Sequence, residues 1–575
     1  MRSTAYSFLC VPHVRQSYNM KTSIKRKVAV FGLDGITFDL LQPWLDEGRL
    51  PNLARLLDTG TGGRLRSTIP PVSASAWASF STGTNPGQHG LVDFTYPAAD
   101  SYQITITNGR TRAVPALWEL VNAAGGECGV VSMPMTYPPQ PLNGFMVCSF
   151  LTPSADSQYT YPPELQNEIT EKCGPFPLHM SEKGRGKNPA LFVQAVKQME
   201  IDRAKAVRHL LQNKPWDLFL YVFETTDNLQ HEVWHLLDES HPLHDPEMAA
   251  KVLPDILDYY ATVDRLLGEM LALLPEDTLV VILSDHGFGP FHKFFHINNW
   301  LAENGWLKFK RTPLSLLKRT AFKLGVTPIN ALKWITRLRL GGMRKNVKRG
   351  RGGGMLRRLF LSFNDVDWAR TKAFSVGNFG QVYLNVEGKR PLGTVTPAEY
   401  DQLRDQIAAA AKKFRDPEDG GQVVPTVYKR EEVFHGISSE KLPDLVLHTD
   451  RAKYVSFGHA DFGSNKLVEP STGQTGHHHM VGVIGLNGPH VAAHTVLSEA
   501  SLLDLAPTIL HYMGLSVPAY MDGKVLTDAF TPEFNAANPI KAVDIDLTSS
   551  GQSGGVSNEE EALVMEKLRD LGYVA

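Results

Sequence analysis

Acidic and imidazole side chains stand at or just after the ends of short apolar runs in this sequence. Asp34 ends KVAVFGLD, Asp227 and His231 come at and after the end of DLFLYVFETTD, and Asp285 and His286 follow TLVVIL. Asp227 and His231 are four residues apart, so one helical turn places both on one face. Mixed carboxylate and imidazole clusters bind Zn²⁺ or Mn²⁺. Two such ions about 4 Å apart can hold the attacking and leaving oxygens of a phosphoryl transfer.

A run of three histidines offers one more ligand. His477, His478 and His479 lie in TGHHHM, just before another apolar run. Taken singly, an Asp at a strand end is usually a helix N-cap or turn residue, and a single His is usually a polar surface residue. The joint occurrence of all these residues, in this order, favours a metal centre.

A candidate nucleophile lies in IPPVSASAWASFSTGTNPGQHG, where two prolines lead into a hydroxyl-rich turn and a predicted helix, roughly 74–82. A hydroxyl at a helix start meets unpaired backbone N–H groups and the positive end of the helix dipole, which also favours a bound phosphate. A metal-bound serine oxygen is more acidic and therefore a competent nucleophile. The alternative is that Ser73 is an N-cap and nothing more.

The elements that must position these residues alternate along the chain. Four apolar runs predict buried strands, which we expect to be parallel, and amphipathic segments such as 190–212 and 254–274 predict the helices between them. This alternation predicts an α/β fold with a mostly parallel central sheet flanked by helices. Open sheets of this kind build their sites at the carboxyl ends of the strands.

Composition and charge restrict the class of protein. The chain has 575 residues, 42% of them hydrophobic, and a formal net charge of −2, which excludes a collagen-like, coiled-coil or largely disordered protein. It contains no apolar run of 18 residues, so no transmembrane helix is expected. Four scattered cysteines without a C-x-x-C pair favour a reducing, cytoplasmic location.

One segment carries a concentrated positive charge. Residues 308–358 hold 16 Lys and Arg and no Asp or Glu, which leaves the rest of the chain at −18. Apolar residues are interspersed with these charges, a pattern typical of helices that lie on anionic membrane surfaces. We expect either a packed insertion with a solvated basic face or a contact with a membrane or another polyanion. The second possibility would make the protein peripheral to the inner face of the membrane.

These features predict a division of the chain into segments. The predicted segments are an N-terminal extension without structure (1–26), the first part of the catalytic core (27–307), a basic amphipathic insertion (308–360), an α/β subdomain (361–460), the closing part of the core (461–530), and a linker with a C-terminal helix (531–575).

Several motifs together resemble those of the alkaline phosphatase superfamily. VFGLDG, PPVSASAW with STGTNPGQHG, TTDNLQH, LSDHGFGP and TGHHHM are most similar to the type I phosphodiesterase/nucleotide pyrophosphatase branch, including its bacterial phosphohydrolase/phosphomutase group. The resemblance covers about residues 27–526 and the LGYVA ending. It implies an alkaline phosphatase-like core with insertions.

The resemblance also implies roles for individual residues. Asp34, Asp285 and His286 would hold one metal, and Ser73 would bridge both metals as the nucleophile. The second metal would be held by Asp227, His231 and one histidine of the run. His478 is the choice that matches the family pattern, with His477 and His479 as alternatives. Zn²⁺ is the expected metal and Mn²⁺ the alternative.

The implied activity is that of a metal-dependent phosphohydrolase, with a diesterase favoured. Ser73 would form a covalent phosphoryl-enzyme that water then hydrolyses. The first alternative is a phosphomonoesterase or a phosphoglycerate mutase-like phosphotransferase, and the second is a non-catalytic relative that binds phosphate. Nucleotide pyrophosphatases have Asn three residues after the nucleophile, where this sequence has Ala76 followed by Trp77. Nucleotide specificity is therefore not implied. SASAW also lacks the Pro and Arg of a sulfatase.

Overall fold

The computed structural model of the protein describes residues 24–180, 182–331, 360–449, 453–458, 462–471, 473–545, 547 and 557–570. Most of the predicted N-terminal extension, residues 1–23, lies outside this part, as do residues 332–359 of the basic insertion. Residues 24–26 are described, and Arg26 donates a hydrogen bond to the Tyr512 carbonyl oxygen at 2.9 Å.

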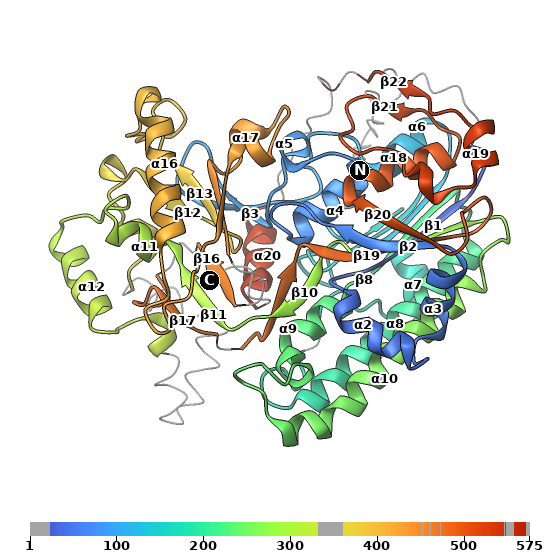
Figure 1. Cartoon of the computed structure of the whole chain (residues 1–575), viewed down its shortest axis with the longest axis horizontal. Coiled ribbons are helices and arrows are strands. Elements are labelled where there is room, and N and C mark those ends of the chain that lie inside the picture. Colours follow the sequence, from blue (N-terminus) through green and yellow to red (C-terminus); the bar gives the residue numbers. More distant parts are fainter. Residues whose placement is uncertain are drawn as a thin grey trace, which may run out of the picture.

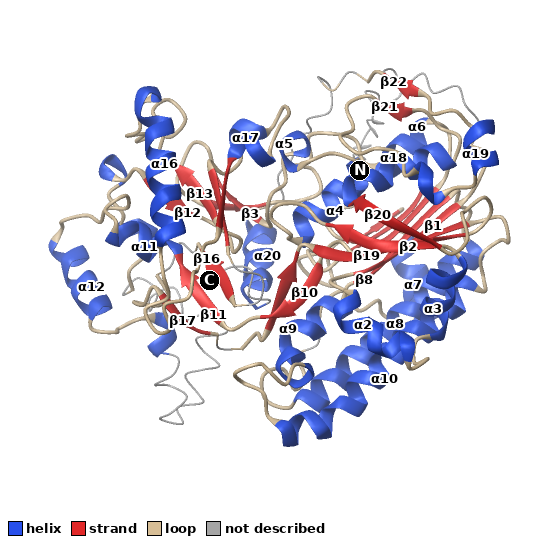
Figure 2. Ribbon diagram, in the orientation of Figure 1, coloured by secondary structure: helices blue, strands red, loops and turns tan. Residues whose placement is uncertain are grey.

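A nine-stranded sheet forms the centre of the larger lobe (Figures 1 and 2). Its order is β20-β2-β19-β9-β1-β8-β5-β6-β7, and all strands except β19 and β7 run in one direction. The strands are β1 (Val28–Leu33), β2 (Thr61–Arg66), β5 (Cys128–Met133), β6 (Gly144–Cys148), β7 (Thr160–Tyr161), β8 (Leu218–Phe223), β9 (Leu279–Leu283), β19 (Val481–Asn487) and β20 (Thr495–Ser501). The predicted α/β fold with a mostly parallel sheet is confirmed.

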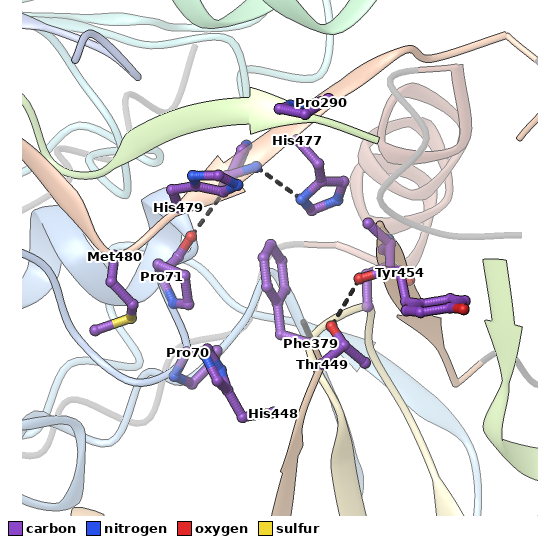
Figure 3. Close-up of a pocket in the computed structure, with 13 residues that line it drawn as sticks. Pro70, Pro71, Pro290, Phe379, His448, Thr449, Tyr454, His477, His479 and Met480 are labelled. Atoms are coloured by element: carbon purple, nitrogen blue, oxygen red, sulfur yellow. Dashed lines mark hydrogen bonds between the residues drawn. The ribbon is translucent and has the colours of Figure 1, made fainter. Parts of the chain in front are cut away.

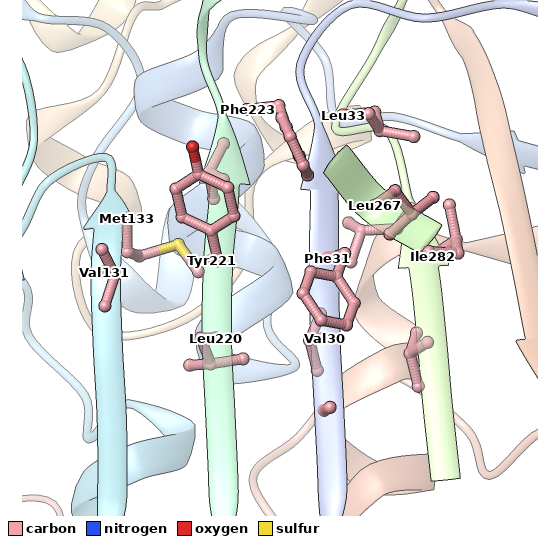
Figure 4. Packing of buried hydrophobic residues seen from close by; sticks show 14 of the residues in the cluster. Val30, Phe31, Leu33, Val131, Met133, Leu220, Tyr221, Phe223, Leu267 and Ile282 are labelled. Atoms are coloured by element: carbon pink, nitrogen blue, oxygen red, sulfur yellow. The ribbon is translucent and has the colours of Figure 1, made fainter. Parts of the chain in front are cut away.

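Helices cover both faces of this sheet, as Figure 1 shows. One face carries α2 (Phe38–Asp46), α3 (Pro51–Thr59), α7 (Leu165–Cys173), α8 (Pro189–Asn213) and α10 (Pro246–Leu271). The other carries α4 (Ser73–Thr82), α6 (Leu117–Ala123) and α18 (Leu505–Tyr512). The central strands are buried from end to end, because side chains on both faces meet helices. Figure 4 shows this packing around Val30, Leu220 and Ile282.

One expectation about the sheet was wrong. The apolar run that becomes β19 was expected to be a parallel strand, but it pairs antiparallel with both β2 and β9. A buried apolar run has the same composition in either direction, so its sequence carries no signal of orientation.

A smaller lobe has its own hydrophobic core. It contains a four-stranded sheet, ordered β12-β13-β15-β14, and a three-stranded sheet, ordered β16-β11-β17. Its elements are β11 (Lys293–His296), α11 (Ile297–Glu303), α12 (Pro313–Lys323), β12 (Ala373–Ser375), β13 (Gln381–Leu384), α16 (Pro397–Lys413), β14 (Thr426–Lys429), α17 (Arg430–Val433), β15 (Leu445–His448), β16 (Tyr454–Phe457) and β17 (Val468–Pro470). This core also takes in Phe295 and Trp300, which precede the predicted insertion. The predicted segment boundaries stay a prediction.

The remaining elements connect or extend the lobes. They are α5 (Pro86–His89), β3 (Thr95–Pro97), β4 (Ile104–Ile106), α9 (Thr225–Leu237), β10 (Gly287–Pro290), β18 (Gly476–His479), β21 (Val517–Pro518), α19 (Pro532–Ala537), β22 (Ala542–Val543) and α20 (Asn558–Asp570). In Figure 1, α20 lies between the two lobes. Cys128, Cys148 and Cys173 are free thiols, and no helix of the described chain is long and apolar enough to cross a membrane.

Candidate active site and metal centre

Three adjacent strands bring the predicted acids together. β8, β1 and β9 are neighbours in register, with Leu33 opposite Phe223 and Gly32 opposite Leu283. Asp34 directly follows β1. It therefore lies beside the start of α9, the helix after β8, and beside the turn after β9. The carboxyl ends of neighbouring parallel strands meet at one edge of the sheet, and this is where the site lies.

A two-stranded antiparallel ribbon supplies the histidine run. β10 pairs with β18, and Phe288 stands opposite His478. β10 follows directly after His286, which itself follows β9. The pairing of β10 with β18 therefore places the histidine run close to the end of β9. The His286 and His478 rings stack with centroids 3.7 Å apart.

Six buried side chains form two groups with the geometry of metal sites. In each group, one ligand atom per residue lies within 4.8 Å of the others; the groups are Asp34, Asp285 and His286, and Asp227, His231 and His478. The structure thus assembles all six side chains named from the sequence, and of the three histidines it places His478 in the second group. His477 lies alongside and accepts a hydrogen bond from the His478 backbone N–H.

The three imidazoles all present Nε2 to the centre. Nδ1 of His231 is 2.8 Å from the Gly476 carbonyl oxygen, that of His286 is 3.0 Å from Gly287 O, and that of His478 is 3.0 Å from Pro71 O. A carbonyl oxygen can accept a hydrogen bond but cannot donate one, so each Nδ1 carries the proton. Each Nε2 is then an unprotonated lone pair, which is the form that binds a metal.

The remaining polar atoms also fit a cation. Nε2 of His231 and Nε2 of His478 are 3.1 Å apart, although neither has a proton to give the other. Asp34 Oδ1 and Asp285 Oδ2 are buried without a hydrogen-bond donor among the described residues. Burial raises the pKa of Asp285 to about 7. Burial, followed by repulsion from Asp285 and Asp227, holds the pKa of Asp34 well above its usual range. Divalent cations would neutralise this cluster.

Ser73 lies beside the first group. It is the first residue of α4, after an N-cap at Val72, and its Oγ is 3.1 Å from His286 Nε2. Ser73 therefore does not occupy the N-cap position that was its alternative interpretation. Its side chain is 2% exposed and faces a cavity that Asp34 and Asp227 also line. The neighbouring N–H groups of Ala74 and Ser75 lie in the first turn of the helix, where they have no intrahelical acceptor.

Supporting contacts to this site were not anticipated from the sequence. Trp77 Nε1 donates to Asp34 Oδ2 at 3.1 Å, and the ring lies so close to β1 that a Cβ on Gly32 would be 2.3 Å from it. Gln230 Nε2 donates to the Gly35 carbonyl oxygen at 3.1 Å, and Thr226 Oγ1 donates to that of Asp34 at 2.6 Å. These contacts fix the turn that carries Asp34.

Cavities lie on two sides of the centre. One of about 240 Å³ is lined by Asp34, Ser73 and Asp227 and also by Lys567 of the C-terminal helix. A smaller one of about 50 Å³ is shown in Figure 3, where the histidine run faces Pro70 and Phe379. The smaller lobe thus forms part of the wall of the site.

Comparison with known families agrees with this geometry. The family model for type I phosphodiesterase/nucleotide pyrophosphatase matches residues 28–479, which is most of the chain. The chain belongs to this family. The resemblance predicted from the motifs is confirmed, and the protein is a phosphoric ester hydrolase of the phosphodiesterase/pyrophosphatase type, for which the family implies dependence on divalent metals.

A solved hydrolase structure shows a related fold, and a second structure is more distantly similar. Phosphonoacetate hydrolase from Sinorhizobium meliloti, in complex with phosphonoacetate, aligns over 84% of this chain and 98% of its own with a TM-score of 0.51 and 16% identity. Murine ectonucleotide pyrophosphatase/phosphodiesterase 5, solved as an inactive variant in complex with AMP, aligns over 88% of this chain and all of its own with a TM-score of 0.47 and 13% identity. A search of curated protein sequences finds no match.

Proposed function

We propose that this family member hydrolyses phosphate diesters with Ser73 as the nucleophile, at a site that binds two divalent cations. The observation that carries this proposal is a pair of buried Asp/His groups at a helix start. One group contains His286, whose Nε2 is 3.1 Å from Ser73 Oγ, and the other contains Asp227, which lines the same cavity as Ser73.

The donors indicate which ions the groups would hold. Three imidazole nitrogens and three carboxylates suit Zn²⁺ first and Mn²⁺ second. Bound cations of this kind supply charge neutralisation for the phosphate and lower the pKa of a neighbouring hydroxyl. The Ser73 hydroxyl, 3.1 Å from His286 Nε2, is our candidate for that group.

The chain's own groups account for the other parts of the reaction. A bond forms between Ser73 Oγ and phosphorus while the bond from phosphorus to the departing oxygen breaks, and the proton of the Ser73 hydroxyl ends on the departing oxygen. The N–H groups of Ala74 and Ser75, at the positive end of α4, can donate to phosphate oxygens. In a second step, the oxygen of a water molecule bonds to phosphorus, the bond between phosphorus and Ser73 Oγ breaks, and a proton from the water returns to that oxygen.

The test is the Ser73→Ala variant. We expect its turnover of bis-p-nitrophenyl phosphate to fall at least about 10³-fold while its metal content, measured by elemental analysis, stays close to that of the wild type. A variant that turned over at the wild-type rate would refute the role of Ser73.

Two cavities on different sides of the centre support a diester as the substrate. A diester carries two organic groups, and the structure offers space beside Ser73 as well as beside His478. The wild type should therefore hydrolyse bis-p-nitrophenyl phosphate faster than p-nitrophenyl phosphate. The reverse preference would favour the phosphomonoesterase or phosphotransferase alternative.

The described part of the basic insertion supports contact with an anionic membrane surface. α12 and the turn after it expose Leu314 at 61%, Leu317 at 67% and Leu324 at 79%. Residues 308–331 carry basic side chains and no acidic one. Exposed leucines among cations are typical of elements that lie on lipid. The remainder, residues 332–358, lies outside the described part. A cytoplasmic location stays a prediction.

Sedimentation with vesicles tests this contact. The double variant Leu314→Asp/Leu317→Asp should bind vesicles that contain phosphatidylserine several-fold less than the wild type does. Leu191→Asp is the matched control, because Leu191 is an exposed leucine on α8, at 45%. Equal binding of all three proteins would refute the contact.

A further inference from the structure

The C-terminal helix α20 packs against the segment that carries the nucleophile. Val564 and Leu568 are buried, and they join a hydrophobic cluster that includes Val72 and Ala74, the residues on either side of Ser73. Polar contacts fix the other end of the helix, where Glu560 accepts a hydrogen bond from the Tyr137 hydroxyl at 2.6 Å. The helix is therefore seated on the wall of the active site.

This seating brings Lys567 into the larger cavity, the one of about 240 Å³ that Ser73 also lines. Lys567 is half-buried, and its Nζ donates to the Thr152 carbonyl oxygen at 2.8 Å and contacts His179 Nε2. Neither partner carries a negative charge, since one is a backbone carbonyl and burial lowers the pKa of His179 to about 4. Burial lowers the pKa of Lys567 to about 8, so the side chain is predominantly charged at pH 7.

Other charges that line this cavity already have partners. Arg203 pairs with Glu224 at 2.8 Å, and Glu182 pairs with Arg185 at 3.1 Å. Asp34 and Asp227 belong to the two ligand groups. Among the described residues, no carboxylate lies within ion-pairing distance of Lys567. A half-buried cation without a counter-ion is costly unless an anion joins it.

The lining of this cavity also includes apolar side chains. Phe150, Met180 and Met199 line it. A dry cavity of about 150 Å³ is large enough for a benzene ring, so this one can hold an organic group of at least that size. A lining that combines Ser73, a cation and apolar side chains matches a ligand that has a phosphorus centre, an organic group and a second acidic group.

We propose that the larger cavity binds the organic part of the substrate and that Lys567 of α20 binds a second anionic group on it. The substrate class is then a phosphate ester whose organic part carries a carboxylate or a further phosphate group. This inference rests on the proposed function, since it assumes that the substrate's phosphorus lies at Ser73. In this role Lys567 is a specificity-determining residue that the chain supplies from its far end.

Ligand binding tests this separately from turnover. Phenylphosphonate, 4-carboxyphenylphosphonate and benzene-1,4-bisphosphonate have no ester bond to cleave and differ in the group opposite the phosphorus. Calorimetry with the metal-loaded wild type should show that at least one acidic ligand binds about 10-fold to 100-fold more tightly than phenylphosphonate, the range expected for a hydrogen bond to a charged group. Comparison of 4-carboxyphenylphosphonate with benzene-1,4-bisphosphonate shows which acidic group the cavity prefers.

Variants test whether Lys567 causes the preference for acidic ligands. Lys567→Met should remove the preference and weaken phenylphosphonate binding less than threefold, whereas Lys567→Arg should restore most of it. Glu566→Gln, at an exposed position one residue earlier on α20, is the matched control and should bind like the wild type. Lys567→Gln keeps the hydrogen-bonding capacity without the charge and serves if the Met variant unfolds.

The outcomes separate the two proposals. An absence of preference in the wild type, or equal loss for acidic and neutral ligands in Lys567→Met, would overturn the role of Lys567. A wild type that shows the preference but hydrolyses no phosphate diester would overturn the proposed diesterase and leave the anion site standing.

Discussion

The indole of Trp77 holds the carboxylate of Asp34 in place, with Nε1 donating to Oδ2 at 3.1 Å. Trp77 is 1% exposed and stands one helical turn after Ser73 on α4, so the same helix supplies the candidate nucleophile and orients a proposed ligand of the first metal. Hydrogen bonds of this kind tune metal affinity, because they fix the direction in which a ligand presents its lone pairs.

Trp77→Phe keeps a buried aromatic ring and removes the hydrogen bond. We expect metal affinity at the first group to fall about 10-fold to 100-fold, with activity recovered when excess Zn²⁺ is added. Titration against a chelator of known affinity measures the change. Trp44→Phe, at a buried tryptophan on α2 that contacts Tyr260, is the control and should leave the affinity within about twofold. Equal affinity in all three proteins would contradict the role of Trp77.

Neighbouring histidines provide a second test. His478→Ala should remove one ion of the two, because it takes a ligand from the group of Asp227 and His231. His477→Ala should keep both ions, since His477 lies outside that group and contacts it through the His478 backbone. Elemental analysis after gel filtration gives the stoichiometry. Loss of an ion in His477→Ala with retention in His478→Ala would reverse the assignment that the sequence left open.

The carboxyl ends of β1, β8 and β9 could be predicted from sequence, because buried apolar runs that end in Asp place those residues at one edge of an α/β sheet. The choice of His478 rests on a family resemblance. The structure adds a physical reason, because Nδ1 of His478 faces the Pro71 carbonyl oxygen and its Nε2 is left as the lone pair that can bind a metal. The hydrogen bond from Trp77 to Asp34 could not be predicted from sequence, since an aromatic residue on a buried helix is usually part of the core. Lys567 lies almost five hundred residues from Ser73, and no local pattern indicates that a C-terminal helix returns to the site.

Gly35 provides a third test, through its backbone conformation. Its φ of +71° lies in the left-handed region, and a Cβ there would be 3.0 Å from the Phe288 ring and 3.4 Å from the Asp227 backbone. Gly35→Ala should therefore destabilise the fold by about 1 kcal/mol or more and displace Asp34 or Asp227. Thermal unfolding and metal content measure the two effects. Gly48→Ala, also at positive φ but with open space around its Cβ, should lower stability without changing metal content.

A buried carboxyl group outside the metal centre predicts how stability changes with pH. Asp93 accepts hydrogen bonds from Gln381 Nε2 at 2.8 Å and from the Phe94 N–H at 2.7 Å, and burial raises its pKa to about 7. In the unfolded chain this pKa is about 4. Between these values the folded protein keeps a proton that the unfolded chain has released, so the contribution of Asp93 to stability falls as pH rises through this window.

Asp93→Asn cannot titrate and should lack this part of the pH dependence. We expect the free energy of unfolding of the variant, relative to wild type, to shift in favour of the variant by up to about 4 kcal/mol between pH 4 and pH 8. Urea unfolding at several pH values measures the shift, and a difference that grows in favour of the wild type as pH rises would contradict it. Asp100→Asn, at an exposed position, should run parallel to the wild type, because its charge is solvated in both states.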